Sequence, residues 1–142
     1  MRVADLKGGA LDYWVAKASG FGDKIRFTDY GPGYEERCFF FYPLLDEAGF
    51  EIYPSGSDWN PSSNWDQGGP IIHREGIGFW KGYDSESRGK VEVWEASTLN
   101  PVSAIEVQGP QGIGPTPLIA AMCAYVRLKF GREVEDAPHE AG

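Results

Sequence analysis

The first helical pattern in the chain lies near its beginning. In segment 9–18 apolar residues recur at positions i, i+3, i+4 and i+7, namely Leu11, Trp14, Val15 and Ala18. Asp12 and Lys17 fall elsewhere on the helical wheel, so we expect an amphipathic helix that packs on a core. Gly20 and Gly22 follow, and glycine suits the left-handed conformation that ends many helices.

A second helix is predicted near the end of the chain. Thr116 is a good N-cap, Pro117 suits the first helical position, and Gly131 is a natural stop after Phe130. The apolar residues spread almost round the wheel, as Leu118, Ile119, Met122, Tyr125, Val126, Leu128 and Phe130. We therefore expect this helix to be buried on more than one side. If the chain itself cannot cover both sides, a homodimer would, and we keep that option open.

Between these helices the chain consists of short β-rich pieces separated by Gly, Pro, Asn and Ser clusters. The predicted strands are Ile25 to Thr28, Arg37 to Tyr42, Phe50 to Tyr53, Gly78 to Trp80, Val91 to Ala96 and Ala104 to Gln108. The pattern predicts an α+β fold, in which a mainly antiparallel sheet carries an N-terminal and a C-terminal helix. We expect one domain over residues 1–131, a long ordered loop from Asp58 to Gly69, and an acidic, disordered tail over residues 132–142.

Charge and composition narrow the classes of partner. The formal net charge is -8, which repels a phosphate backbone, so we expect no direct binding of nucleic acid. Met1 to Leu11 contains Asp5 and no apolar run of the length that a signal peptide needs, and no apolar run is long enough to span a membrane, so we expect a cytoplasmic protein without a membrane partner. Cys38 and Cys123 lie far apart and lack metal-ligand spacing, so we predict free thiols, no metal and no cofactor.

Three blocks of sequence resemble one family. Residues 60–77, NPSSNWDQGGPIIHREGI, are similar to a PS-x-x-W-x-Q-G-G-P segment of the NinX-like proteins of lambdoid phages. Residues 114–126 resemble the C-terminal helix of that family, and residues 9–18 resemble its N-terminal helix. The resemblance implies a phage or prophage accessory protein in the cytoplasm of a bacterial host, and it implies no particular activity.

The segment from Asp58 to Glu75 is the best candidate site in the sequence, because it concentrates amide, aromatic and charged groups. Trp faces can stack on a planar ring, amides can recognise donor and acceptor edges, and paired glycines let backbone N–H groups approach a ligand. We expect Gln67 and Arg74 to be exposed and dispensable for folding. The alternative is an ordered loop whose Trp residues fill the core and whose polar groups hold turns. The candidate ligand-binding residues are Trp59, Asn64, Trp65, Asp66, Gln67, Gly68, Gly69, Arg74 and Glu75.

Other motifs are weaker. The run Gly109 to Pro117 has the glycines of a phosphate loop but lacks the Walker ending, so a plain strand-to-helix connection is favoured and anion binding there is a minor alternative. His73, next to Arg74 and Glu75, is the one candidate for general acid/base chemistry that the sequence offers. A lone histidine is weak evidence, so we assign no catalytic residue. We predict non-enzymatic binding or sequestration of a small, nucleotide-like molecule. The alternatives are a module that binds a host protein and, third, an enzyme acting on a small metabolite.

Overall fold

The computed structural model describes residues 1–28, 36–83, 92–98 and 111–135. Over these residues the chain forms three α-helices, α1 (Gly8–Ala18), α2 (Trp65–Glu75) and α4 (Pro117–Phe130). It also forms two short 3-10 turns, η1 (Val3–Asp5) and η2 (Gly22–Lys24), and seven strands. The strands are β1 (Ile25–Thr28), β2 (Arg37–Phe40), β3 (Leu44–Leu45), β4 (Glu51–Tyr53), β5 (Ile77–Tyr83), β6 (Glu92–Thr98) and β7 (Gly112–Gly114).

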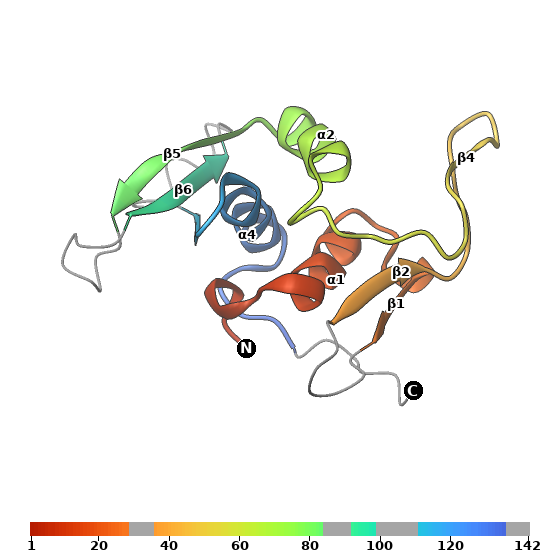
Figure 1. Cartoon of the computed structure of the whole chain (residues 1–142), viewed down its shortest axis with the longest axis horizontal. Coiled ribbons are helices and arrows are strands. Elements are labelled where there is room, and N and C mark those ends of the chain that lie inside the picture. Colours follow the sequence, from red (N-terminus) through yellow and green to blue (C-terminus); the bar gives the residue numbers. More distant parts are fainter. Residues whose placement is uncertain (29–35, 84–91, 99–110, 136–142) are drawn as a thin grey trace.

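Two helices occupy the middle of the molecule and separate the larger sheets (Figure 1). α1 packs against α4, the β1–β2 pair packs on α1, and the β5–β6–β7 sheet packs on α4. β3 and β4 form a hairpin of their own that projects from the body (Figure 1). The pairs are antiparallel, which confirms the α+β prediction, although the described strands form three small sheets rather than one.

α4 has the boundaries that its sequence predicts. The Thr116 hydroxyl accepts a hydrogen bond of 3.1 Å from the amide of Ile119, and Gly131 ends the helix with a φ of 86°. Met122 and Val126 are fully buried. The cover comes from α1, α2 and the strands β5, β6 and β7 of the same chain. The apolar circumference of α4 therefore gives no reason to invoke a second subunit.

α1 begins one residue earlier than predicted, and the helical wheel gave the wrong position for Asp12. Asp12 is 4% exposed and lies among the core residues Leu11, Tyr13 and Val15. The prediction that Asp12 faces away from the core is thus wrong, because α1 is covered both by α4 and by the β1–β2 pair.

The predicted loop from Asp58 to Gly69 is wrong in its second half, where α2 begins at Trp65. The Asn64 side chain caps α2 by accepting a hydrogen bond of 2.9 Å from the amide of Asp66. Gly76, with a φ of 64°, ends it in the left-handed conformation. Pro70 lies inside the helix, in its second turn. A Gly-Gly-Pro run is typical of a turn, but here it lies inside a helix that is capped at both ends, by Asn64 and Gly76.

Strand prediction succeeded for β1 and found β2, β4, β5 and β6 with shifted ends. β3 and β7 were not predicted, and the strand predicted at Ala104 to Gln108 lies outside the described residues. β7 lies within the run that was interpreted as a plain connection. Its Gly112 is needed for close packing, because a Cβ atom there would lie 2.0 Å from the main-chain oxygen of Ala120 in α4.

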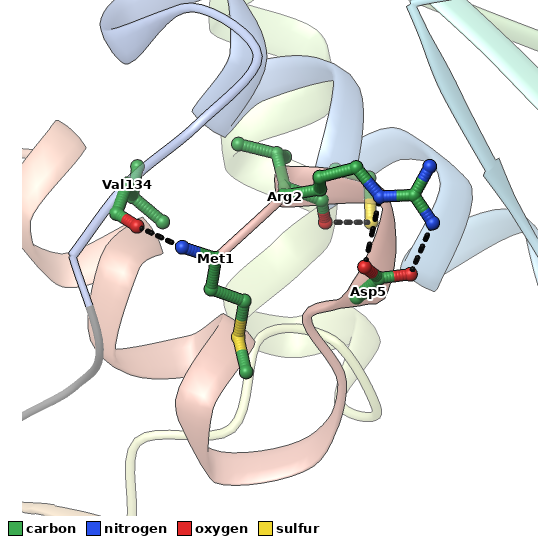
Figure 2. Close-up of polar contacts among 6 residues, drawn as sticks. Met1, Arg2, Asp5 and Val134 are labelled. Carbon is green, nitrogen blue, oxygen red and sulfur yellow. Dashed lines mark hydrogen bonds and ion pairs between the residues drawn. The ribbon is translucent and has the colours of Figure 1, made fainter.

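The chain's first residues pair with a segment that follows α4. The Met1 amino group donates to the oxygen of Val134 over 2.8 Å (Figure 2), and the amide of Val3 donates to the oxygen of Arg132 over 2.8 Å. Ordered structure therefore extends past Gly131 into the predicted tail, whereas residues 136–142 lie outside the described residues. No helix in the described part of the chain has the length and apolar character needed to cross a membrane.

Candidate functional site: a cleft beside a buried carboxyl group

A cleft of about 660 Å³ opens where the start of α1, the start of β2 and the segment 58–63 meet. Its volume is in the range of small-molecule sites. The polar and charged side chains that line it include Lys7, Asp12, Arg37, Asp58, Asn60 and Ser62. Gly9 lets α1 approach β1 and the residue before β2 closely. A Cβ atom on Gly9 would lie 2.8 Å from the Phe27 ring and 3.0 Å from the backbone of Glu36.

Asp12 fastens the segment 58–63 to α1. Its carboxyl Oδ1 accepts a hydrogen bond of 2.8 Å from the amide of Ser62, and its main-chain oxygen accepts one of 2.8 Å from the Trp59 indole. On the other side, the Trp59 amide donates to the oxygen of Cys38 in β2 over 2.8 Å. One carboxyl group thus lies at the point where the three walls of the cleft join.

The buried position changes the acidity of this carboxyl. Burial raises the pKa of Asp12 to about 7, and the hydrogen bonds from Ser62 oppose that rise. Burial also raises the pKa of the neighbouring Cys38 thiol, and the negative charge of Asp12 raises it further. At neutral pH the cleft therefore holds a carboxyl group near the midpoint of its titration and a protonated thiol.

The remaining charged side chains make the cleft acidic once Asp12 ionises. Four carboxyl groups, on Asp5, Asp12, Glu36 and Asp58, line it together with the side-chain cations of Lys7 and Arg37 and with Met1, which carries the N-terminal ammonium group. Arg37 forms an ion pair with Asp58. Such a cleft favours a ligand that is cationic or that donates hydrogen bonds, and it disfavours an anion. Among the described residues, no cluster of three or more His, Cys, Asp or Glu side chains is placed to hold a metal ion.

Of the residues predicted from sequence, Trp59 lines this cleft but is also a core residue. It is 3% exposed, and its ring packs edge-on against Phe21 at 4.9 Å and against Phe40 at 5.7 Å between ring centroids. Its indole N–H is already bonded to Asp12. Trp59 therefore forms part of the wall and offers little free ring surface for stacking on a ligand.

Gln67 and Gly68 serve the fold. Gln67 is 7% exposed, its amide oxygen accepts a bond of 2.7 Å from the Asn60 amide, and its amide nitrogen donates 2.8 Å to the Asp58 oxygen. A Cβ atom on Gly68 would lie 2.5 Å from the oxygen of Pro61. The expectation that Gln67 is exposed is wrong, and its two hydrogen bonds to the turn that forms one wall of the cleft argue against its being dispensable for folding.

The other predicted residues are spread along α2. Trp65 is 50% exposed in the first turn, next to the exposed Asp66, and Asn64 precedes them as the N-cap. Arg74, in the last turn, donates to Glu75 over 3.1 Å and to the Tyr125 hydroxyl over 3.2 Å. Nine residues at about 100° each put Trp65 and Arg74 on opposite faces of the helix, so they do not converge on one ligand. Gly69 has open space beside it.

Sequence reasoning missed Asp12, Cys38 and Ser62. A signal for Asp12 was present, because the run 13–16 that follows it is wholly apolar and implies a helix covered on more than one side. A carboxylate in such a helix must be desolvated, and a desolvated carboxylate titrates far from its usual range. The pairing of Asp12 with Ser62, fifty residues away, had no local signature.

The fold and cleft define a small α+β protein with a candidate ligand site near its N-terminal helix. The family model described as Bacteriophage P22, NinX matches residues 2–129, so the chain belongs to this phage protein family. The match confirms the resemblance seen in the three sequence blocks. No curated protein matches the chain with significant similarity.

Proposed function

We propose that the protein is a phage accessory protein that binds a small molecule in the cleft beside Asp12. The ligand class is a small molecule with amino or amidino donors, of the kind that a nucleobase presents. The observation that carries the proposal is the Asp12 carboxyl group, which is buried at the cleft with a pKa raised to about 7. A donor ligand would stabilise the ionised carboxylate and so offset the cost of its burial.

Binding is favoured over catalysis by the state of the two reactive groups. The Cys38 thiol is protonated at neutral pH because burial raises its pKa, whereas a nucleophilic cysteine requires a lowered one. One oxygen of Asp12 is engaged by the Ser62 amide in the wall of the cleft. These groups suit recognition of donors, and we therefore assign them no covalent chemistry.

The test uses benzamidine, a planar amidinium, and cytidine as probes, followed by amide chemical shifts of the full chain. We expect saturable shifts at Asn60 and Ser62. Asp12→Asn should weaken benzamidine binding about tenfold, which corresponds to roughly 1.4 kcal/mol. The matched control is Asp66→Asn, an exposed carboxylate outside this cleft. Equal affinities for wild type and Asp12→Asn, or no shifts at the cleft at millimolar probe, would contradict the proposal.

A second candidate function, binding of a host protein, is favoured by the β3–β4 hairpin. It exposes Phe50 to 72% and also exposes Leu45 and Ile52. The turn is built rigidly, because the Asp46 side chain accepts bonds of 3.0 Å and 2.9 Å from the amides of Ala48 and Phe50. An exposed apolar patch on a preorganised turn is typical of a protein-binding surface.

The charges on the hairpin indicate the kind of partner. Asp46, Glu47 and Glu51 are exposed and acidic, so the partner surface should have an apolar groove with a basic rim. A photoreactive amino acid at position 50 should crosslink one host protein in cells, and the same group at position 66 should not. Identical crosslinks from both positions, or none from position 50, would remove this candidate.

A further inference from the structure

A second pocket, of about 330 Å³, lies between η1, β7 and the end of α4. It shares no lining residue with the cleft beside Asp12. Three of the chain's seven arginines line it, Arg2, Arg127 and Arg132, although the chain as a whole is strongly acidic. The remaining lining is largely apolar and includes the buried Val3 and Cys123 and the half-exposed Ile113.

The arginines are not all neutralised within the protein. Arg2 donates to both carboxylate oxygens of Asp5, over 3.0 Å and 3.3 Å (Figure 2). Among the residues that the structure describes, neither Arg127 nor Arg132 forms an ion pair with a carboxylate. The lining thus includes three guanidinium groups, and guanidinium stays protonated at neutral pH.

The position of the arginines is held by the backbone. The Val3 amide donates to the oxygen of Arg132, and the Val134 amide donates to the oxygen of Met1 over 2.9 Å. The segment after α4 is thereby fixed beside η1, which brings residues 2 and 132 to one rim. The glycine at position 112 lets β7 pack closely on α4, and this close packing brings Ile113 to the pocket beside Arg127.

We propose that this pocket binds a small phosphate monoester, with the phosphate on the three arginines and the organic part against Ile113 and Val3. A phosphate monoester carries a charge of about -1.5 to -2 at neutral pH and three acceptor oxygens, so it can engage several guanidinium groups where a single carboxylate engages fewer. Guanidinium also pairs with phosphate oxygens in a bidentate fashion. The volume of the pocket lies at the lower end of small-molecule sites.

Arg127 has a second role that the experiment must separate. It lies in the last turn of α4, where any cation interacts favourably with the helix dipole. Lys129 lies in the same turn but does not line the pocket, so Lys129→Gln removes an equivalent charge without touching the site. Arg132 is exposed, so Arg132→Gln tests the site without disturbing the helix.

The test is calorimetric titration of the full chain with adenosine monophosphate, adenosine and inorganic phosphate at low ionic strength. We expect adenosine monophosphate to bind, adenosine not to bind, and inorganic phosphate to bind more weakly than the monoester. Arg127→Gln and Arg132→Gln should each weaken binding at least about tenfold, and Lys129→Gln less than about twofold. Thermal melts check that each variant is folded. If Arg127→Gln does not fold, the binding measured for Arg132→Gln tests the proposal.

Equal binding of adenosine and adenosine monophosphate, or equal loss in Lys129→Gln and Arg132→Gln, would overturn the proposal. The result is independent of the cleft beside Asp12, because Asp12→Asn should leave binding of the monophosphate unchanged. Loss of benzamidine binding in Asp12→Asn and loss of monophosphate binding in Arg132→Gln are therefore separate outcomes. Either site can fail without the other.

Discussion

The Asp12 carboxyl and the Ser62 amide, fifty residues apart in sequence, form a buried hydrogen bond of 2.8 Å. This bond joins α1 to the segment that leads into α2, and it places a titratable group at the wall of the cleft. We therefore expect both the stability of the fold and the binding proposed for the cleft to depend on the protonation state of Asp12.

Asp12 should make folding pH-dependent near neutrality. Its pKa in the folded chain is about 7, above the ordinary value of 3.8, so the folded state holds its proton more tightly than the unfolded state does. The stability from this group is full below about pH 4 and is lost as pH rises towards and through 7. A rise of about three pKa units corresponds to roughly 4 kcal/mol.

Urea unfolding of wild type and Asp12→Asn between pH 4 and pH 8 measures this effect. The difference between the two proteins isolates Asp12 from the other titrating groups, because the amide of asparagine does not ionise. Wild type should lose stability relative to the variant as pH rises. A constant difference across the range would show that the pKa of Asp12 is ordinary.

Gln67→Ala should destabilise the fold, because it leaves the Asn60 amide and the Asp58 oxygen without the partner that they have now. An unsatisfied buried polar group costs about 1–3 kcal/mol. Arg74→Ala, which removes a half-exposed side chain from the same helix, should cost less. Denaturant midpoints of the two single variants check this, and equal midpoints would show that Gln67 is not a turn-holding residue.

Met122→Ala should lower the free energy of unfolding by about 2–5 kcal/mol, because Met122 is fully buried in α4 between the elements that cover it. Lys129→Ala, on the exposed side of the same helix, should change it by less than about 0.5 kcal/mol. Chemical unfolding compares the two. An unchanged midpoint for Met122→Ala would show that α4 is peripheral.

Two glycine substitutions should have unequal effects. Gly112→Ala places a Cβ atom 2.0 Å from the Ala120 oxygen, so β7 must move away from α4 and the protein should melt at a lower temperature. Apart from its chain neighbours and its own helix backbone, a Cβ atom on Gly69 meets nothing within 4 Å, but the ring of the following Pro70 disfavours the helical conformation for a residue with a Cβ, so Gly69→Ala should melt close to wild type. Thermal melts test the pair, and a Gly112→Ala protein as stable as wild type would contradict the close packing.

Local sequence signals predicted the terminal helices well, because their caps and stops lie within the elements that they limit. Thr116 and Gly131 fixed α4, and Gly20 followed α1 as expected. α2 was not predicted, because the segment that leads into it is polar and rich in turn residues, although Asn64, Gln67 at the third helical position and Gly76 form a helix signature.

The candidate site was harder to predict because it depends on contacts between distant segments. Asp12 becomes a titrating group only when segment 58–63 covers α1, and Gln67 becomes a turn-holding residue only when α2 directs it at Asp58 and Asn60. The sequence predicted a site in the region that contains Trp59 and Asn60, and both residues line the cleft. It did not distinguish side chains that form a wall from side chains free to bind.

The most direct test of the proposed site is a carbon-13 NMR titration of the Asp12 carboxyl with and without saturating benzamidine. Without the probe, the pKa of Asp12 should be about 7. A bound amidinium beside the carboxylate should lower that pKa by about one unit or more, and the affinity for benzamidine should rise as pH increases through 7. An Asp12 pKa that is the same with and without benzamidine would contradict the account.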